Sequence, residues 1–227
     1  MLLNNRPTQS APHGTIISLG FFCGVAKELK RFGLRKKSFP FDWLITDGET
    51  VIEFIANDFS GFLDEDSLVR DVERPDIIHN KNCKTMFLHD FPVGKPLTEH
   101  LPANRKKYQR RIKRFYKTLR QGALCVRYMA DQKECDYWES NFTRLLSLLQ
   151  QFNKNNEVLF IANSDVNSEK LYLYSVDKVP GGLVADFFIN SNKQLFEDLI
   201  LKNLRGIGKI KARGKYLKQA LKQRWKR

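Results

Sequence analysis

The chain has 227 residues, of which 42% are hydrophobic and 17 are phenylalanine, as expected for a globular domain rather than a disordered segment. Its formal net charge is +14, its N-terminal residues are too polar for a signal peptide, and no apolar run approaches the length of a membrane span. The four cysteines lack C-x-x-C spacing, which argues against a zinc site or a thioredoxin-type pair. We therefore expect a cytoplasmic protein with one sizeable domain, no metal and no disulfides.

Strand-like and helix-like segments alternate after a polar arm at residues 1–13. Apolar runs predict strands at Ile16–Leu19, Thr85–His89, Leu124–Met129, Glu157–Ala162, Leu171–Val176 and Val184–Ile189. Helical periodicity predicts helices at Phe22–Phe32, Thr50–Leu63, Asn104–Leu119, Tyr137–Phe152, Lys193–Leu204 and Lys215–Trp225. Such alternation is typical of βαβ units, so we expect an α/β fold: a mostly parallel sheet with helices on both faces, Rossmann-like or esterase-like. Phe41–Ile45 is predicted as a short strand or loop, and Asp64–Lys84 as a surface excursion.

The positive charge is concentrated in two segments. Asn104–Arg120 holds nine Lys and Arg residues and no acid, and Lys202–Arg227 holds eleven and no acid. The rest of the chain is mildly acidic, so we expect a catalytic-type domain at residues 14–201 followed by a basic helical appendage at 202–227. The appendage could dock on the core through Leu217, Leu221 and Trp225, or contact nucleic acid or an anionic membrane surface.

Cys23 stands where the first predicted strand passes through a glycine turn into the first predicted helix. The N–H groups and the positive dipole end of a helix stabilise a thiolate, so a cysteine in the first turn can act as a nucleophile. The alternative is a small buried cysteine without chemistry.

The same region carries a resemblance to a known family. The pattern S-L-G-x-x-C-x-x-A-x-x-L-K-x-x-G-L-R-x-x-S-x-P-F-D-W at Ser18–Trp43, with F-L-H-D-F at Phe87–Phe91 and Y-Q-R-R-I-K-R-F at Tyr108–Phe115, resembles DUF1796, a bacterial family labelled as papain-like cysteine peptidases. The resemblance implies a thiol nucleophile with a histidine partner. A papain-like α+β fold is the alternative architecture that it implies.

Side chains suited to catalysis follow three of the predicted strands. Cys23 follows the first strand, His89 ends the second, and Asn163 and Asp165 follow Glu157–Ala162. Because functional groups gather at the carboxyl ends of parallel strands, we expect a Cys–His–Asx site with Asn163 or Asp165 as the candidate third member. A satisfied interior histidine and an ordinary turn are the alternatives for His89 and for the Asn163–Asp165 segment.

Two further groups are candidates for the site. Asp42, between Phe41 and Trp43, is either a catalytic carboxylate or a polar anchor that accepts backbone N–H groups. Arg110, Arg111 and Arg114 form either a solvated helix face or a site for a phosphate, sulfate or carboxylate. Ser18 is a weaker alternative nucleophile of the GDSL-esterase kind.

These observations predict a thiol-dependent hydrolase or acyl-transfer enzyme with an unidentified substrate, an anion or a glycan being candidates. No P-loop is present and no G-x-G-x-x-G follows a strand, so a dinucleotide cofactor is not expected. One alternative is an acyltransferase of surface polysaccharide biosynthesis with acetyl-coenzyme A as donor. The other is a non-catalytic module that binds anions or nucleic acid.

Overall fold

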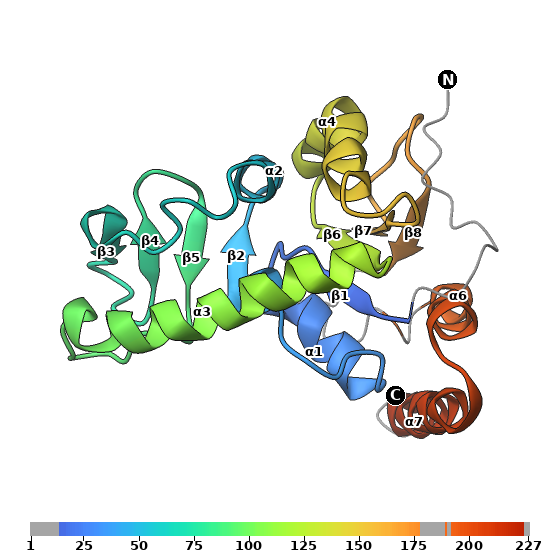
Figure 1. The fold of residues 1–227 in the computed structure, drawn as a ribbon. Coiled ribbons are helices and arrows are strands. Elements are labelled where there is room, and N and C mark those ends of the chain that lie inside the picture. The colour runs from blue at the N-terminus through green and yellow to red at the C-terminus, as the bar shows by residue number, and fades with distance from the viewer. Residues whose placement is uncertain (1–13, 178–188, 190–191, 225–227) are drawn as a thin grey trace.

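Two four-stranded sheets form the framework of the protein in the computed structural model, which describes residues 14–177, 189 and 192–224 (Figure 1). The first sheet contains β1 (Ile16–Ser18), β6 (Leu124–Met129), β7 (Glu157–Asn163) and β8 (Leu173–Val176), in that order. All its neighbouring strands are parallel, with Ile16 opposite Leu124 and Leu124 opposite Glu157. The predicted α/β fold with a parallel sheet is therefore confirmed.

Helices cover both faces of the parallel sheet, as its apolar strands require. One face, which includes Cys125 and Phe160, belongs to a core shared with α2 (Gly48–Ala56) and α4 (Gln132–Gln150). The opposite face, which includes Leu124 and Ile161, belongs to a core shared with three further helices. These helices are α1 (Cys23–Arg31), α6 (Lys193–Asn203) and α7 (Gly206–Arg224). Residues that alternate along each strand thus enter two separate cores.

The second sheet is antiparallel, in the order β2-β5-β4-β3. Its strands are β2 (Leu44–Thr46), β3 (Leu68–Arg70), β4 (Ile78–Asn80) and β5 (Thr85–Phe87). Two expectations were wrong here. The strand predicted at Thr85–His89 does not join the parallel sheet, and the surface excursion predicted at Asp64–Lys84 supplies two strands. Each of these strands is three residues long, too short to show an alternating pattern in the sequence.

The long helix α3 (Leu97–Arg120) connects the two sheets (Figure 1). Near its N-terminal half, the Tyr108 ring packs against Phe62 and Phe87 of the antiparallel region, with ring centroids 4.9 and 6.0 Å away. At its C-terminal end, Asn156 donates to the carbonyl of Leu119 at 3.1 Å, just before β7 begins. Short 3₁₀ helices, η1 (Pro40–Trp43) and η2 (Glu65–Ser67), precede β2 and β3.

A buried arginine joins the sheets at their centre. Arg127, in β6, donates to the carbonyl of Leu19 at 2.8 Å, and to the hydroxyl and carbonyl of Thr46 in β2 at 3.2 and 2.7 Å. It also donates to the carboxylate of Glu134 in α4 at 2.9 and 2.6 Å. These bonds use all five guanidinium N–H groups, which compensates for the burial of the charge.

The C-terminal helices differ in part from the expectation. Lys202 belongs to α6 rather than to the appendage, and its Nζ lies 3.0 Å from Glu157. The basic helix α7 docks through Ala212 and Tyr216, the latter stacked on Phe196 at 4.2 Å. Docking through Leu217 and Leu221 was therefore wrong, because both side chains are exposed.

Other expectations fall partly or wholly outside the described residues: the arm at residues 1–13, most of the strand at Val184–Ile189, and Trp225. Among the helices that the structure describes, none is both long and apolar enough to cross a membrane.

Candidate functional site

The turn between β1 and α1 has a backbone that few residues adopt. Gly20 has φ +84°, and a Cβ there would lie 2.5 Å from the hydroxyl of Thr46, so both conformation and space require glycine. Phe21 follows with φ +69°, which is uncommon for a bulky residue and costs conformational energy. Its carbonyl accepts a hydrogen bond from the N–H of Thr46 at 3.2 Å. The turn is therefore held by the neighbouring sheet.

Cys23 is the first residue of α1 and lies partly exposed at the carboxyl end of β1. Phe22 precedes the helix with an extended backbone, and its side chain accepts no hydrogen bond from the first turn. The first N–H groups of α1 can therefore donate to another acceptor. The Phe22 ring lies over Gly24, where a Cβ would be 1.9 Å from the ring. The predicted strand–turn–cysteine–helix arrangement is present.

The other three cysteines have less reactive surroundings. Burial raises the pKa of Cys125 to about 12 and that of Cys135 to about 11. Cys135 also lies in the first turn of a helix, α4, but it is buried, with its thiol 3.5 Å from the carbonyl of Asn167. Burial also raises the pKa of Cys83, which donates to the hydroxyl of Thr85 at 3.4 Å. Cys23 alone combines partial exposure with a helix N-terminus.

Tyr128 links the Cys23 turn to the end of β7. Its ring lies 5.8 and 5.4 Å from the rings of Phe21 and Phe22, and its hydroxyl donates to the side-chain oxygen of Asn163. Burial, followed by the charge of Asp165, raises the pKa of Tyr128 to about 12. Asn163 and Asp165 thus lie at the same sheet edge as Cys23, as predicted. Tyr128 was not predicted, although its place at the end of an apolar strand was a signal.

Asp42 lies in a second cluster, where it is fully buried. One carboxylate oxygen accepts from Arg35 and from the N–H of Phe39, the latter at 2.9 Å. Burial raises the pKa of Asp42 to about 6, although Arg35, the Phe39 N–H and the charges of Arg111 and Arg114 each lower it. This geometry matches the polar anchor of the two roles that the sequence left open.

Arg35 connects this cluster to α1. Its Nε donates to the carbonyl of Ala26 at 3.2 Å, and its guanidinium lies 5.7 Å from the centre of the Trp43 ring. His89 is exposed, and its ring makes a T-shaped contact with the ring of Trp43, with the two centroids 5.7 Å apart. Within the described residues no hydrogen bond joins His89 to Cys23. The two residues follow strands of different sheets, contrary to the expected common edge.

Asp90, the residue after His89, links this segment to α3. Asp90 is buried and accepts from Lys107 and from the hydroxyl of Tyr108, the latter at 2.8 Å. Its carbonyl accepts from the side chain of Asn104 at 2.7 Å. Burial, followed by the charge of Asp90, raises the pKa of Tyr108 well above its ordinary value.

The three arginines of α3 have different surroundings. Arg110 is exposed, whereas Arg114 donates to the carbonyl of Ser38, next to the Asp42 cluster. Arg111 lies over the Tyr108 ring at 4.9 Å, and its buried Nη1 has no hydrogen-bond partner among the described residues. Arg111 and Arg114 are the two α3 arginines whose charges lower the pKa of Asp42. Ser18, the alternative nucleophile, is fully buried, and its hydroxyl accepts from the N–H of Gly20 at 3.2 Å.

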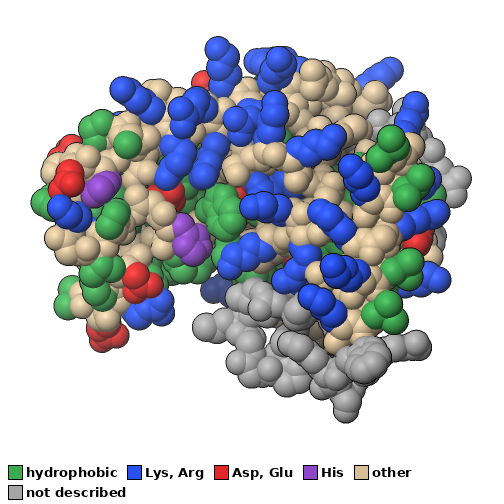
Figure 2. Space-filling model, turned by 90° about the horizontal axis from the view of Figure 1, so that it is seen from below, with side chains coloured by type: hydrophobic (Ala, Val, Ile, Leu, Met, Phe, Trp, Pro, Cys, Tyr) green, Lys and Arg blue, Asp and Glu red, His purple; other side chains and the backbone are tan. Residues whose placement is uncertain are grey.

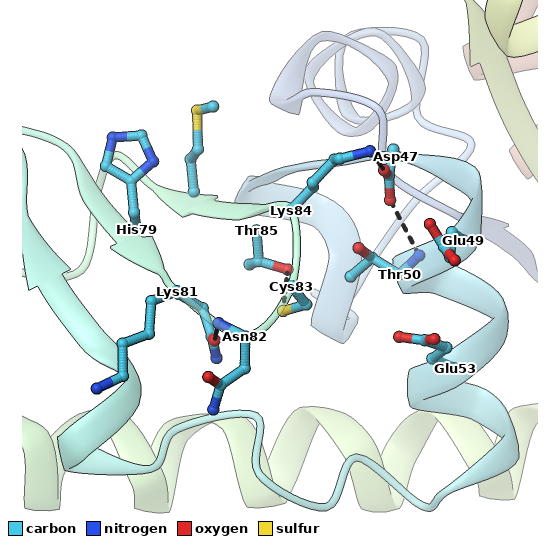
Figure 3. A pocket seen from close by; sticks show the side chains of 12 residues that line it. Asp47, Glu49, Thr50, Glu53, His79, Lys81, Asn82, Cys83, Lys84 and Thr85 are labelled. Carbon is cyan, nitrogen blue, oxygen red and sulfur yellow. Dashed lines mark hydrogen bonds and ion pairs between the residues drawn. The ribbon is translucent and has the colours of Figure 1, made fainter.

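A cavity of about 560 Å³ lies elsewhere, between α2 and the β4–β5 hairpin (Figure 3). Glu49 and Glu53 line one wall, Lys81 and Asn82 line the other, and Cys83 lies between them (Figure 3). None of the residues predicted for the site lines this cavity. In the described part of the chain, no group of three or more His, Cys, Asp or Glu residues could hold a metal ion.

Comparison with known proteins gives two similarities. The model of the DUF1796 family, described as "Putative papain-like cysteine peptidase", matches residues 14–163. An uncharacterized protein of Acanthamoeba polyphaga mimivirus, R408, is 30% identical over 163 residues, which cover 63% of this chain and 73% of that protein. No solved structure matches. The matched family region includes Cys23, Asp42 and His89, and it ends before β8, α6 and α7.

Proposed function

The chain belongs to the DUF1796 family of putative papain-like cysteine peptidases, and on this premise we propose that it is a thiol-dependent enzyme with Cys23 as the nucleophile. One observation carries the proposal: Cys23 is partly exposed at the N-terminus of α1, after a turn with two successive left-handed residues. Backbone strain of this kind is stored at functional sites.

The first turn of α1 supports a role for the thiol. N–H groups at a helix N-terminus stabilise negative charge, both on a thiolate and on the oxygen of a tetrahedral intermediate. Phe22 supplies no side-chain acceptor for them. The amides of Gly24 and Val25 are therefore our candidates for binding the oxyanion.

The reaction follows from these groups. A base removes the proton of Cys23, and the sulfur attacks a carbonyl carbon of the substrate, which forms a C–S bond and an oxyanion. The carbonyl re-forms as the bond to the leaving amine, alcohol or thiol breaks, and the protonated base gives its proton to that group. Water or an acceptor hydroxyl then attacks the thioester, loses its proton to the base and releases the acyl group, which restores the Cys23 thiol.

We assign the base to His89, the histidine that the resemblance implies. Its exposed ring lies against Trp43, just before β2 begins, whereas the hydrogen bond to Phe21 of the Cys23 turn comes from Thr46, the last residue of β2. Asn163 and Asp165 lie near Tyr128 at the edge of the parallel sheet, the edge that carries Cys23 rather than His89.

Hydrolysis of a peptide and transfer of an acyl group use the same first half-reaction. The family description favours a peptidase. Transfer from acetyl-coenzyme A is the finer alternative, and Arg111 and Arg114 are the candidates for binding its phosphates because the arginine fork suits such anions. The acceptor, water or a hydroxyl of a glycan, distinguishes the two activities.

The test is alkylation of the folded protein by iodoacetamide as a function of pH, with each cysteine quantified by mass spectrometry. Cys23 should react faster than Cys83, Cys125 and Cys135 across the pH range. The advantage of Cys23 should vanish in denaturant, since it depends on the fold. Equal slow reaction of all four thiols would contradict the proposal.

The same assay tests His89. Replacement His89→Ala should slow alkylation of Cys23 near neutral pH, whereas the matched control His79→Ala should not, because His79 pairs with Asp71 in the other part of the antiparallel sheet. Incubation with p-nitrophenyl acetate should place an acetyl thioester on Cys23, and the Cys23→Ser variant should release no p-nitrophenol at the enzymatic rate. An unchanged rate in that variant would remove Cys23 from the chemistry.

One observation favours a second candidate, a module that binds anions without catalysis. Seen from below, the protein presents many Lys and Arg side chains and few Asp and Glu side chains (Figure 2). Binding to a polyanion through such a face falls steeply with salt. An unreactive Cys23 together with tight, salt-dependent binding to duplex RNA would favour this candidate over the enzyme.

A further inference from the structure

The C-terminal helix α7 has one side docked on the protein and one side exposed to solvent. On the docked side Ala212 is 1% exposed, and the ring of Tyr216 is stacked between helices, 4.2 Å from Phe196 and 6.1 Å from Phe32. Arg213 adds an ion pair to Glu197 of α6 at 2.9 Å. The orientation of the helix on the core is therefore fixed by specific contacts.

The exposed side carries large aliphatic side chains that this docking leaves in solvent. Ile207, Ile210, Leu217 and Leu221 are 72%, 71%, 61% and 56% exposed. Together with Gly214 they recur at steps of three or four residues, so they form one continuous row along the helix, here called the α7 apolar row. Single exposed leucines are ordinary, but a row of four over most of a helix marks an interaction surface.

Cations border this row. Lys211, Lys215, Lys218 and Lys222 each follow a member of the row by one residue and therefore form a parallel row beside it. All four are exposed, and α7 contains no acidic residue. The underside of the molecule, on which α7 lies in Figure 1, is rich in Lys and Arg (Figure 2).

We propose that α7 binds the surface of an anionic lipid bilayer, lying in the interface with the α7 apolar row toward the acyl chains and the lysines at the headgroups. An anionic membrane offers an apolar layer directly beneath an extended negative surface, which is what the two adjacent rows match. Nucleic acid would engage the lysines but leave the four aliphatic side chains in water. The proposal goes beyond the thiol chemistry and does not depend on it.

Flotation of the full-length protein with lipid vesicles tests the proposal. The protein should float with vesicles of phosphatidylcholine mixed with phosphatidylserine, and much less with phosphatidylcholine alone. The variant Leu217→Ser/Leu221→Ser should bind the anionic vesicles about tenfold more weakly, since two side chains no longer enter the interface. Its melting temperature should stay unchanged, because both side chains are exposed in the folded protein.

Matched controls separate the α7 rows from general stickiness and charge. The variant Val69→Ser/Val72→Ser removes two other exposed aliphatic side chains and should bind like the parent. Two triple variants lose equal charge, one on α7 and one on α3: Lys211→Gln/Lys218→Gln/Lys222→Gln and Lys106→Gln/Lys113→Gln/Lys117→Gln. The α7 triple variant should lose more than tenfold in affinity, since each cation near the surface contributes about fivefold, and the α3 triple variant should lose little.

Three results would overturn the proposal. The first is equal loss in the two triple variants, which would mean that only overall charge matters. The second is binding of the Leu217→Ser/Leu221→Ser variant at the parental strength, which would remove the apolar row from the interaction. The third is binding to duplex RNA without binding to anionic vesicles, which would identify the surface as a nucleic-acid site.

Discussion

Two buried arginines, Arg127 and Arg35, hold different parts of the protein and differ in how fully they are compensated. Arg127 is fully buried and uses all five N–H groups on acceptors from the residue after β1, from β2 and from α4. Arg35 also pairs with a buried carboxylate, that of Asp42, but one oxygen of Asp42 has no hydrogen-bond partner among the described residues.

Charge balance shows the same difference. Glu134 is the carboxylate that pairs with Arg127, whereas Asp42 lies within the field of three arginines, Arg35, Arg111 and Arg114. The first region is a joint between the two sheets in which the buried positive and negative charges balance. The second region has three arginines around one carboxylate and a buried Nη1 of Arg111 without a hydrogen-bond partner among the described residues. Hydrogen bonds therefore satisfy the buried charge more fully in the first region than in the second.

Removing the two guanidinium groups tests the comparison most strongly. Arg127→Met should lower the free energy of unfolding by about 4 kcal/mol, because Glu134 and two backbone carbonyls lose their donors in the interior. Arg35→Met should lower the free energy of unfolding by less, about 2 to 3 kcal/mol, because Arg111 and Arg114 still lie near Asp42. Urea denaturation measures both values. An equal or larger loss for Arg35→Met would mean that the two regions are not distinct.

The pH dependence of Asp42→Asn is the next test. Between pH 3.8 and about 6, folded Asp42 keeps a proton that the unfolded chain has released, so this carboxyl makes the folded state less stable as the pH rises. Near pH 3.8 the free energy of unfolding of Asp42→Asn should be about 2 kcal/mol lower than that of the parent, and this difference should shrink toward pH 6. The exposed control Asp66→Asn should show no such trend. A deficit that grows with pH would show that the pKa of Asp42 is lowered instead.

Gly20→Ala tests the contact between the Cys23 turn and the joint around Arg127. A Cβ at Gly20 would lie 2.5 Å from the hydroxyl of Thr46 and 3.4 Å from Nη1 of Arg127, at a φ of +84°. We expect the free energy of unfolding to fall by about 1 to 2 kcal/mol and the alkylation of Cys23 to become slower. Gly94→Ala is the matched control, since Gly94 has φ +77° and open space around it. Equal losses in both variants would mean that strain alone, and not contact with the joint, determines the effect.

The smallest effect should distinguish Arg111 from Arg110. Arg111→Gln removes a guanidinium from the Tyr108 ring and should change the free energy of unfolding by about 0.5 kcal/mol. It should also raise the pKa of Asp42 further, which moves the pH window above upward. Arg110→Gln, on the exposed side of the same helix, should do neither. Identical pH profiles for the two variants would remove Arg111 from the field around Asp42.

The sequence was sufficient for the parallel sheet but not for the antiparallel one. Leu124–Met129 and Glu157–Asn163 are mostly apolar runs of six and seven residues, as expected of central strands. Leu68–Arg70 and Ile78–Asn80 are three residues long and contain polar residues. The first pairs with the second, and the second pairs with β5, through tertiary contacts that no local pattern reports.

The same limit applies to the candidate site. The glycine turn before Cys23 is a local signal, and it predicted the position of the thiol at the start of α1. The roles of Tyr128 and Arg127 depend on the register of β6 against β1, which pairs residues more than a hundred positions apart. His89 was assigned to the wrong sheet because strand direction and sheet membership are not encoded in the strand itself.

The span of the Arg127 hydrogen bonds has a consequence for the order in which the molecule forms. Arg127 is 108 residues from Leu19 and 81 residues from Thr46 along the chain. During synthesis, the strand–turn–helix that carries Cys23 therefore emerges long before the side chain that fixes it to β2. Contacts of such long range also form late in folding. A nascent chain that ends before β6 should thus lack the fixed turn around Cys23, which should arise only when the two sheets have been joined.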